Sequence, residues 1–161
     1  MRRPGLSWTT ALSLLLTLLG ALLALPSGAP ESVCRSMLPL HSGLRKFNGS
    51  DSPYRLVQEK AAFTLTNPWP AMTLYTKNSL FKGFLVRAID EQGNDIGHFL
   101  RLTGYKNVRG CTDVTHKSRN NKRTVKMIWQ APHHGSGRVT FKATVVQEYR
   151  RVYADLKSTL K

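Results

Sequence analysis

The sequence is short of acidic residues, of cysteines and of long apolar runs, and each shortage excludes a class of protein. Only nine Asp and Glu residues accompany 24 Lys and Arg, so the chain carries a formal net charge of +15. So few carboxylates, with no paired set among them, leave little for general acid–base catalysis. The excess of cations indicates an anionic partner instead.

Motifs for nucleophilic catalysis and for metal binding are also missing. The chain has no Gly-x-Ser-x-Gly elbow, and the string around Ser136 is typical of a turn between strands. Its five histidines lack the spacing of a zinc site, and no glycine-rich loop suits a phosphate. We therefore expect no enzyme, no metal and no cofactor.

The one long apolar run lies at the N-terminus. Arg2 and Arg3 precede the apolar stretch 11–25, which is shorter than the roughly 20 residues that a membrane span needs. The small residues Ser27 and Ala29 follow it, as in a cleavage site. The pattern predicts a signal peptide over residues 1–29, with an uncleaved anchor or a buried helix as the alternative.

Cleavage near Ala29 would leave a single secreted, extracellular domain, residues 30–161, with enough chain to bury a core. Export makes nucleic acid the least expected partner. An oxidising compartment favours a disulfide between Cys34 and Cys111, the only cysteines, although two free thiols or an intermolecular bridge are alternatives. Asn48 begins the only Asn-x-Ser/Thr glycosylation sequon.

Short strand-like segments alternate with turn residues along this domain, which predicts an all-β sandwich. In the last segment Phe141, Ala143 and Val145 fall on one face, so we expect them and Trp129 in the core. Beyond residue 148 the pattern fits either a short basic amphipathic helix or a longer strand with a frayed tail. The expected strands are 62–66, 72–76, 83–89, 98–102, 124–129 and 138–147.

Two loops have an unusual composition. Lys117, Arg119, Lys122 and Arg123 lie in a stretch with no acid and no apolar residue, so their fields add. We predict that they bind polyanions; the alternative is a solvated loop that only keeps the protein in solution. Trp69, between two prolines, is the one tryptophan expected to be partly exposed, and it is a second binding candidate unless it packs over its own loop.

Several short motifs follow one another in the order of a known family, the reeler domain, which is named for its place at the N-terminus of reelin. The family also includes F-spondin-like and ferric-chelate-reductase-like proteins. The residues that resemble its motifs are Cys34, Met37, Pro39 and His41, then Phe81 to Leu85, Gly97 and Phe99, Cys111, Thr115 and His116, Lys126, Trp129, Ala131 and Pro132, and Phe141 to Tyr149.

The resemblance implies an immunoglobulin-like β-sandwich whose disulfide maps onto Cys34 and Cys111, and it brings no catalytic residue. Larger family members have a second bridge in this domain, for which this chain has no cysteines. The chain therefore looks like the short, stand-alone insect proteins associated with defence. It implies a secreted antimicrobial factor that binds anionic microbial surfaces, with at most peripheral membrane contact. The alternative is an extracellular matrix or adhesion module that binds a sulfated glycosaminoglycan or a protein receptor.

Overall fold

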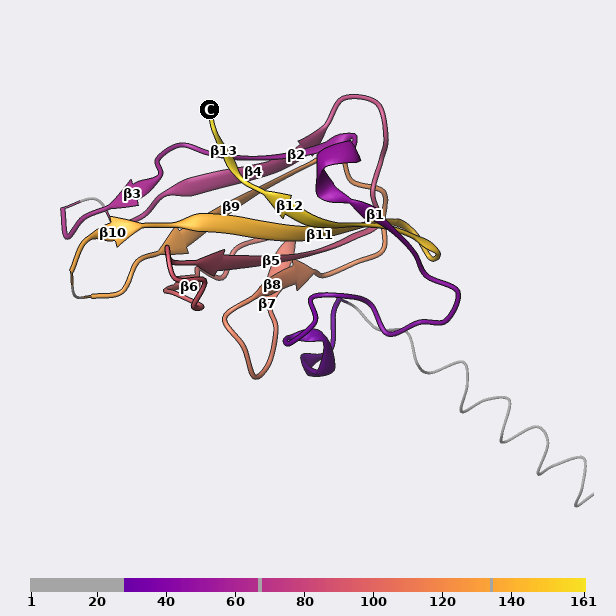
Figure 1. Ribbon diagram of the computed structural model, residues 1–161, viewed down its shortest axis with the longest axis horizontal. Coiled ribbons are helices and arrows are strands. Elements are labelled where there is room, and N and C mark those ends of the chain that lie inside the picture. The colour runs from indigo at the N-terminus through magenta and orange to yellow at the C-terminus, as the bar shows by residue number, and fades with distance from the viewer. Residues whose placement is uncertain (1–27, 67, 134) are drawn as a thin grey trace, which may run out of the picture.

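Two β-sheets packed face to face form the body of the molecule (Figure 1), as seen in a computed structural model that describes residues 28–66, 68–133 and 135–161. The larger sheet has the order β1-β12-β11-β5-β8-β7 and the smaller one β13-β2-β4-β9-β6, while β3 and β10 form a separate pair. Strands β1 and β12 pair in parallel, as do β13 and β2, and the other neighbours are antiparallel. The predicted all-β, immunoglobulin-like sandwich is confirmed.

The strands and the two short 3-10 helices have the following bounds: η1 (Glu31–Val33), β1 (Arg45–Asn48), η2 (Gly49–Asp51), β2 (Tyr54–Gln58), β3 (Ala62–Phe63), β4 (Ala71–Thr76), β5 (Gly83–Ile89), β6 (His98–Phe99), β7 (Tyr105–Asn107), β8 (Val114–His116), β9 (Thr124–Gln130), β10 (Gly137–Arg138), β11 (Thr140–Glu148), β12 (Arg151–Lys157) and β13 (Thr159–Leu160).

All six predicted strands exist, but the ends of five of them differ from the prediction. The segment 83–89 coincides with β5, whereas 62–66 and 98–102 continue only to Phe63 and Phe99. The C-terminal segment is strand and not helix, but it is not a longer last strand with a frayed tail: the chain turns at Tyr149 and Arg150 and returns as β12, which is paired on both sides, with β1 and β11. A helix at this place would leave the backbone of β11 unpaired along that edge.

Alternating side chains of both sheets meet in one core. Phe141 of the larger sheet and Trp129 of the smaller one are fully buried, and their rings meet edge to face with centroids 5.8 Å apart. The indole Nε1 of Trp129 donates a hydrogen bond of 2.9 Å to the carbonyl of Ile96. Ala143 and Val145 are buried beside Phe141, so the predicted inward face of β11 is confirmed.

The outward face of the larger sheet is partly covered by the N-terminal segment. Leu85, which points away from the main core, packs with Val33 and Val108 in a second apolar cluster. The disulfide between Cys34 and Cys111 closes this cluster, with the two Cα atoms 6.1 Å apart. The N-terminal segment is therefore fastened to the larger sheet next to β7 and β8.

Candidate functional site

Three loops and the start of β1 meet at one end of the sandwich, called the basic end below: residues 77–82, 117–123, 147–151 and 41–46. Phe81 and Lys122 exchange two backbone hydrogen bonds, of 3.0 and 2.8 Å. The amide of Lys82 donates to the carbonyl of Val146, and the amide of Arg45 donates to that of Arg150. Loops that are far apart in the sequence thus form one continuous surface (Figure 1).

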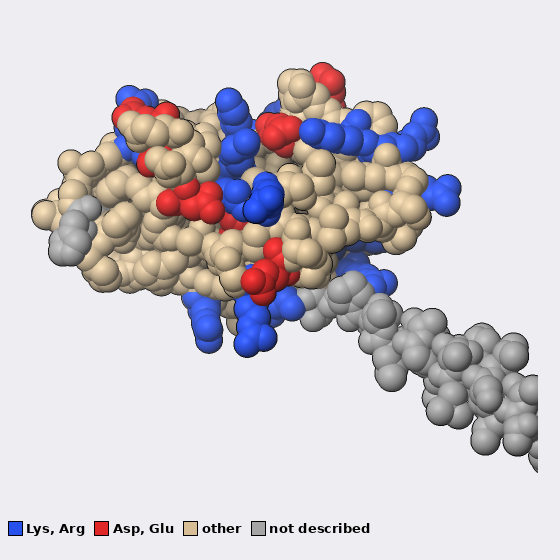
Figure 2. All heavy atoms as spheres, turned by 60° about the horizontal axis from the view of Figure 1, so that its bottom comes forward, with Lys and Arg blue, Asp and Glu red and all other residues tan. Residues whose placement is uncertain are grey.

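The basic end has a strong excess of positive charge. In the sequence of its four segments, Glu148 is the only acid. At the opposite end the loops carry Asp90, Glu91 and Asp95, and Glu59 lies just after β2. Figure 2 shows Lys and Arg, without acids, at the right-hand tip of the face it presents, whereas acids lie over its centre and left, among further Lys and Arg. The charge of the chain is therefore unevenly distributed along the sandwich.

Lys122, one of the four predicted polyanion ligands, holds the loop together. Its Nζ donates hydrogen bonds to the carbonyls of Lys82, Ser118 and Asn120, at 2.9, 2.6 and 2.7 Å. Burial lowers the pKa of this ammonium group. All three of its protons are thus directed at the backbone, so the side chain has a structural role as well as a charge.

The other three predicted cations are exposed, but they differ in how firmly they are held. Lys117 donates from Nζ to the carbonyl of Leu102 at 3.1 Å, and Arg123 donates from Nη1 to the carbonyl of Lys77. Arg119 has no hydrogen-bond or ion-pair partner among the residues that the structure describes. Arg119 is therefore the member of the loop that is most available to an external anion.

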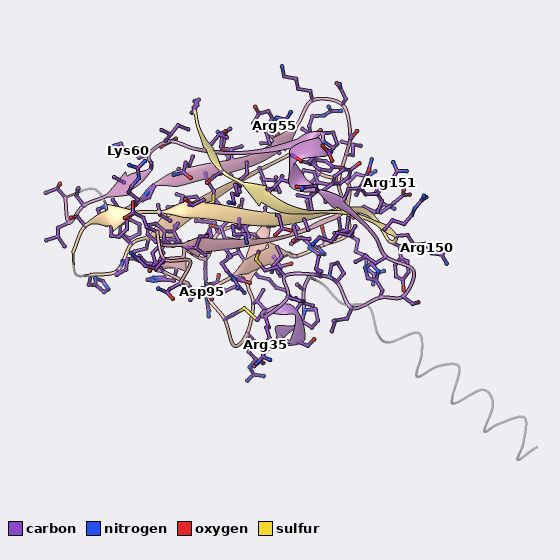
Figure 3. The ribbon with its side chains drawn as sticks, in the orientation of Figure 1. Arg35, Arg55, Lys60, Asp95, Arg150 and Arg151 are labelled. Atoms are coloured by element: carbon purple, nitrogen blue, oxygen red, sulfur yellow. A yellow bond between two sulfur atoms is a disulfide. The ribbon has the colours of Figure 1, made fainter. Side chains whose placement is uncertain are left out.

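The β11–β12 hairpin adds a second group of cations that the sequence reasoning did not assign to a site. Arg45, Arg150 and Arg151 line a small hollow of about 400 Å³ together with Tyr149 and Glu148. Figure 3 shows Arg150 and Arg151 at the tip of the hairpin. Glu148 offsets part of this positive charge, since its Oε1 lies 3.6 Å from Nε of Arg151. The consecutive arginines Arg150 and Arg151 are visible in the sequence and could have indicated this group. The sequence did not show which other loops would lie beside them.

His116 lies at the inner edge of the basic end. Its Nδ1 accepts a hydrogen bond of 3.2 Å from the amide of Phe84, which requires the neutral ring to carry its proton on Nε2. Burial lowers the pKa of His116, a hydrogen bond to the backbone of Phe84 opposes this, and the charges of Lys122, Lys106 and Arg119 lower the pKa further. The ring therefore acts as a neutral acceptor that ties β8 to β5.

A buried ion pair lies beside the disulfide. Arg87 donates from Nε and Nη2 to the two carboxylate oxygens of Asp113, at 2.8 and 2.9 Å, and also from Nη2 to the carbonyl of Cys34. The Asp113 side chain is fully buried, and burial raises its pKa while Arg87 acts in the opposite direction. This pair connects β5, the loop before β8 and the N-terminal segment.

The remaining predicted sites lie apart from the basic loop. Asn48, the predicted glycosylation site, is exposed at the end of β1, and its Oδ1 accepts from the amide of Ser50 at 3.2 Å. Trp69 is 47% exposed, beside Leu65 at 68% in the same connection. The structure therefore leaves Trp69 accessible, as predicted, while the occupancy of the sequon stays a prediction. The predicted signal peptide lies almost wholly outside the described residues.

The described part of the chain contains no group of side chains suited to a metal ion. No three His, Cys, Asp or Glu side chains within residues 28–66, 68–133 and 135–161 are grouped to hold a metal ion. Ser136 is exposed in the connection between β9 and β10. No helix within the same ranges is long and apolar enough to cross a membrane.

The reeler domain family matches residues 32–160, which is most of the chain and all of both sheets. The chain belongs to the reeler domain family. Its fold is similar to the crystal structure of the human F-spondin reeler domain, with a TM-score of 0.59 and 23% identity over 75% of this chain and 95% of the other.

Two kinds of relative share sequence with this reeler domain. The "Putative defense protein" of Bombyx mori is 29% identical over 82% of this chain and 81% of its own length. The "Putative ferric-chelate reductase 1" of Xenopus laevis is 31% identical over 78% of this chain but only 22% of its own length. The chain thus spans about a fifth of that reductase and most of the insect protein.

The reeler motifs of this chain meet one another in space. A Cβ atom on Gly83 would lie 2.7 Å from Cε1 of His116, so the ring packs where only glycine leaves room. Gly97, at a φ of +61°, lies in the same way under Trp129. His41 stacks on Tyr149 with ring centroids 4.2 Å apart. The motifs therefore form pairs that hold the sandwich together.

Proposed function

We propose that this reeler domain is a secreted, non-enzymatic defence protein that binds anionic microbial surfaces through its basic end. The observation that supports the proposal most is the position of the cations: four segments distant in sequence bring them together. Glu148 is the only acid within those segments, and Asp155 of β12, 3.3 Å from Nζ of Lys46, is a second acid beside them. Fields of neighbouring like charges add at such a surface, which attracts polyanions and speeds their association. The similarity to the Bombyx mori protein over most of both chains supports the defence role.

The binding residues in this proposal are Arg119 and Lys117 of the β8–β9 loop and Arg150 of the hairpin, with Arg123 beside them. Lys122 contributes its charge but also holds the loop, so changing it would mix binding with stability. Exposed charges act over about 8 Å at physiological salt, so binding should weaken steeply as salt rises. No cofactor or metal takes part.

A triple charge reversal tests the binding surface. Changing Lys117, Arg119 and Arg150 to Glu should lower the affinity for heparin and for anionic vesicles at least tenfold, equivalent to about 1.4 kcal/mol. The melting temperature should stay close to that of the parent, since the three side chains are exposed. Elution from a heparin column at the parent's salt concentration would refute the proposed surface.

The matched control reverses the same number of charges elsewhere. Arg35, Lys60 and Lys157 are exposed, and Figure 3 places Arg35 beside η1 and Lys60 far from the hairpin. Their change to Glu should affect heparin elution much less than the triple variant does. Viability assays on bacteria then separate the functions. Loss of viability supports a defence factor, whereas saturable glycan binding without it supports a matrix or adhesion module.

A further inference from the structure

The outward face of the smaller sheet is hollowed into a groove of about 1060 Å³. Strands β2, β4 and β9 form its floor. Two apolar side chains contribute to its lining from either side of these strands: Leu102 follows β6 and is 41% exposed, and Leu160 of β13 is 59% exposed. The groove therefore combines a hollow with exposed apolar surface, which is where a ligand with an apolar part could bind.

Strand register gives the floor a graded polarity. Arg55, Tyr75 and Thr124 are register partners and form one row across β2, β4 and β9. Two rows further along, Ala71 of β4 faces Ile128 of β9. Rows on one face of a sheet are about 7 Å apart, so the polar row and the apolar row are about 14 Å apart.

The apolar part of the floor is unusually well formed for an outward face. Val57, Ala71 and Ile128 all point away from the core, yet each is only partly accessible to water. Thr73 on the central strand pairs with Val57 of β2 on one side and with Lys126 of β9 on the other, and its small side chain leaves the middle of the groove open. A linear apolar chain would cover this floor and remove it from water.

The charges along the groove are mostly positive. Arg55, Lys77, Lys126 and Lys161 line it, and Glu59 is the one acid among its lining residues. Figure 3 shows Arg55 on β2, between Lys60 and the hairpin of Arg150. Arg55 and Lys77 lie at the polar end, Lys126 lies in the middle row, and Lys161 lies near Glu59 at the apolar end, where their charges offset each other. A ligand with an apolar chain and an anionic group at the end near Arg55 and Lys77 matches this arrangement.

We propose that the groove binds a single-chain anionic lipid, with the acyl chain over Val57, Ala71 and Ile128 and the headgroup at Arg55 and Lys77. Nη1 of Arg55 donates to the carbonyls of Ser52 and Tyr54, at 2.6 and 3.0 Å, so the headgroup would bind at Nη2 and Nε of the same guanidinium. A sulfated glycan has charges throughout its length and would leave the apolar floor uncovered. A second copy of this chain would bring a like net charge to the same face. This site is separate from the basic end and does not depend on the proposed function.

Calorimetric titration with monomeric dodecyl phosphate tests the site. Dodecyl phosphate should bind with a stoichiometry of one, and dodecylphosphocholine, with the same chain and a zwitterionic head, should bind at least tenfold more weakly. Inorganic phosphate should not compete for the groove. No binding of dodecyl phosphate, or equal binding of the two amphiphiles, would overturn the proposal.

Two variants locate the ligand. Thr73→Trp fills the middle of the floor and should weaken dodecyl phosphate binding at least tenfold. Thr140→Trp, the same change on the outward face of the larger sheet, should leave it unchanged. Arg55→Gln combined with Lys77→Gln should remove the preference for the anionic head. Unchanged affinity in Thr73→Trp would overturn the proposal.

Measurements on the unaltered protein avoid any effect of the variants on folding. In NMR spectra, dodecyl phosphate should shift the methyl signals of Val57 and Ile128 but not those of Val33 and Val108 under the disulfide. Shifts confined to other methyl groups would contradict the site. Heparin elution should be unaffected by Thr73→Trp, so failure of this site and failure of the basic end give different results.

Discussion

Replacing Arg87 by Met should destabilise the domain by about 3 to 5 kcal/mol, because the change leaves a carboxylate buried without its charge partner. The Asp113 side chain is fully buried, and it accepts its two side-chain hydrogen bonds from Arg87 at 2.8 and 2.9 Å. Domains of this size are stable by only about 5 to 15 kcal/mol. The loss would therefore be a large part of the total.

Replacing Asp113 by Asn, with Arg87 kept, should lower the stability less than Arg87→Met does. After Asp113→Asn the Arg87 guanidinium is still 15% exposed, lies 3.4 Å from Asp95 and donates to the carbonyl of Cys34. Its charge therefore keeps some compensation. The double variant Arg87→Met, Asp113→Leu removes both charges and should recover much of the stability that Arg87→Met loses.

The pH dependence of stability gives a second test of the Arg87–Asp113 ion pair. Burial already raises the pKa of Asp113 and Arg87 opposes that effect, so removing Arg87 should let the pKa rise further. The folded variant then takes up a proton that the unfolded chain does not, and its stability deficit should shrink as the pH falls from 7 toward 5. Urea denaturation at both pH values measures this. A deficit below about 1 kcal/mol at pH 7, or one independent of pH, would refute the reasoning.

Three further changes test the rest of the framework. Peptide mapping without reduction should find Cys34 linked to Cys111, and Cys111→Ala should lower the unfolding free energy by about 2 to 5 kcal/mol and reduce secretion; two alkylatable thiols in the native monomer would contradict this. Trp129→Ala and Phe141→Ala should each cost about 3 to 5 kcal/mol in urea denaturation, and an unchanged midpoint would show that the strand phases are wrong. Because the pKa of His116 is lowered in the folded protein, the ring is neutral there, and its contribution to the stability of the fold is complete above about pH 6.5. This contribution is lost as the pH falls below that value toward the pKa of the folded state. Over the same pH range, the melting temperature of His116→Gln should therefore decline less than that of the parent protein.

The strands with a strong period of two could be predicted from the sequence. Gly83–Ile89 is placed correctly because Phe84, Val86 and Ala88 share a face, Arg87 points the other way, and turn residues follow the run. Strand β11 has a clearer alternation of apolar and polar residues. The short strands β1, β7 and β8 were missed, since three or four residues are too few to show a period, and the five-residue strand β2 was missed as well. The parallel pairings of β1 and β13 are also non-local, and neighbouring residues give no sign of them.

The candidate site was predictable in part. The cation run from Lys117 to Arg123 is visible in the sequence, and so is the lack of acids around it. The sequence could not show that Lys122 would find three carbonyl acceptors, because two of them lie in its own loop and the third belongs to Lys82, 40 residues away. Contacts of this kind depend on which loops the sheet topology brings to one end.

The cations of this domain differ in what their charge can do, and net charge alone conceals the difference. Arg87 is neutralised by Asp113, and Lys122 directs its protons at carbonyl groups. Groups held in this way stabilise the fold, and an external anion could reach them only by displacing those partners. Arg119 is exposed and lacks such a partner among the described residues, so it can bind an anion without breaking an existing bond. The affinity of the basic end for polyanions should therefore follow the number of unpartnered cations there, and not the net charge of the chain.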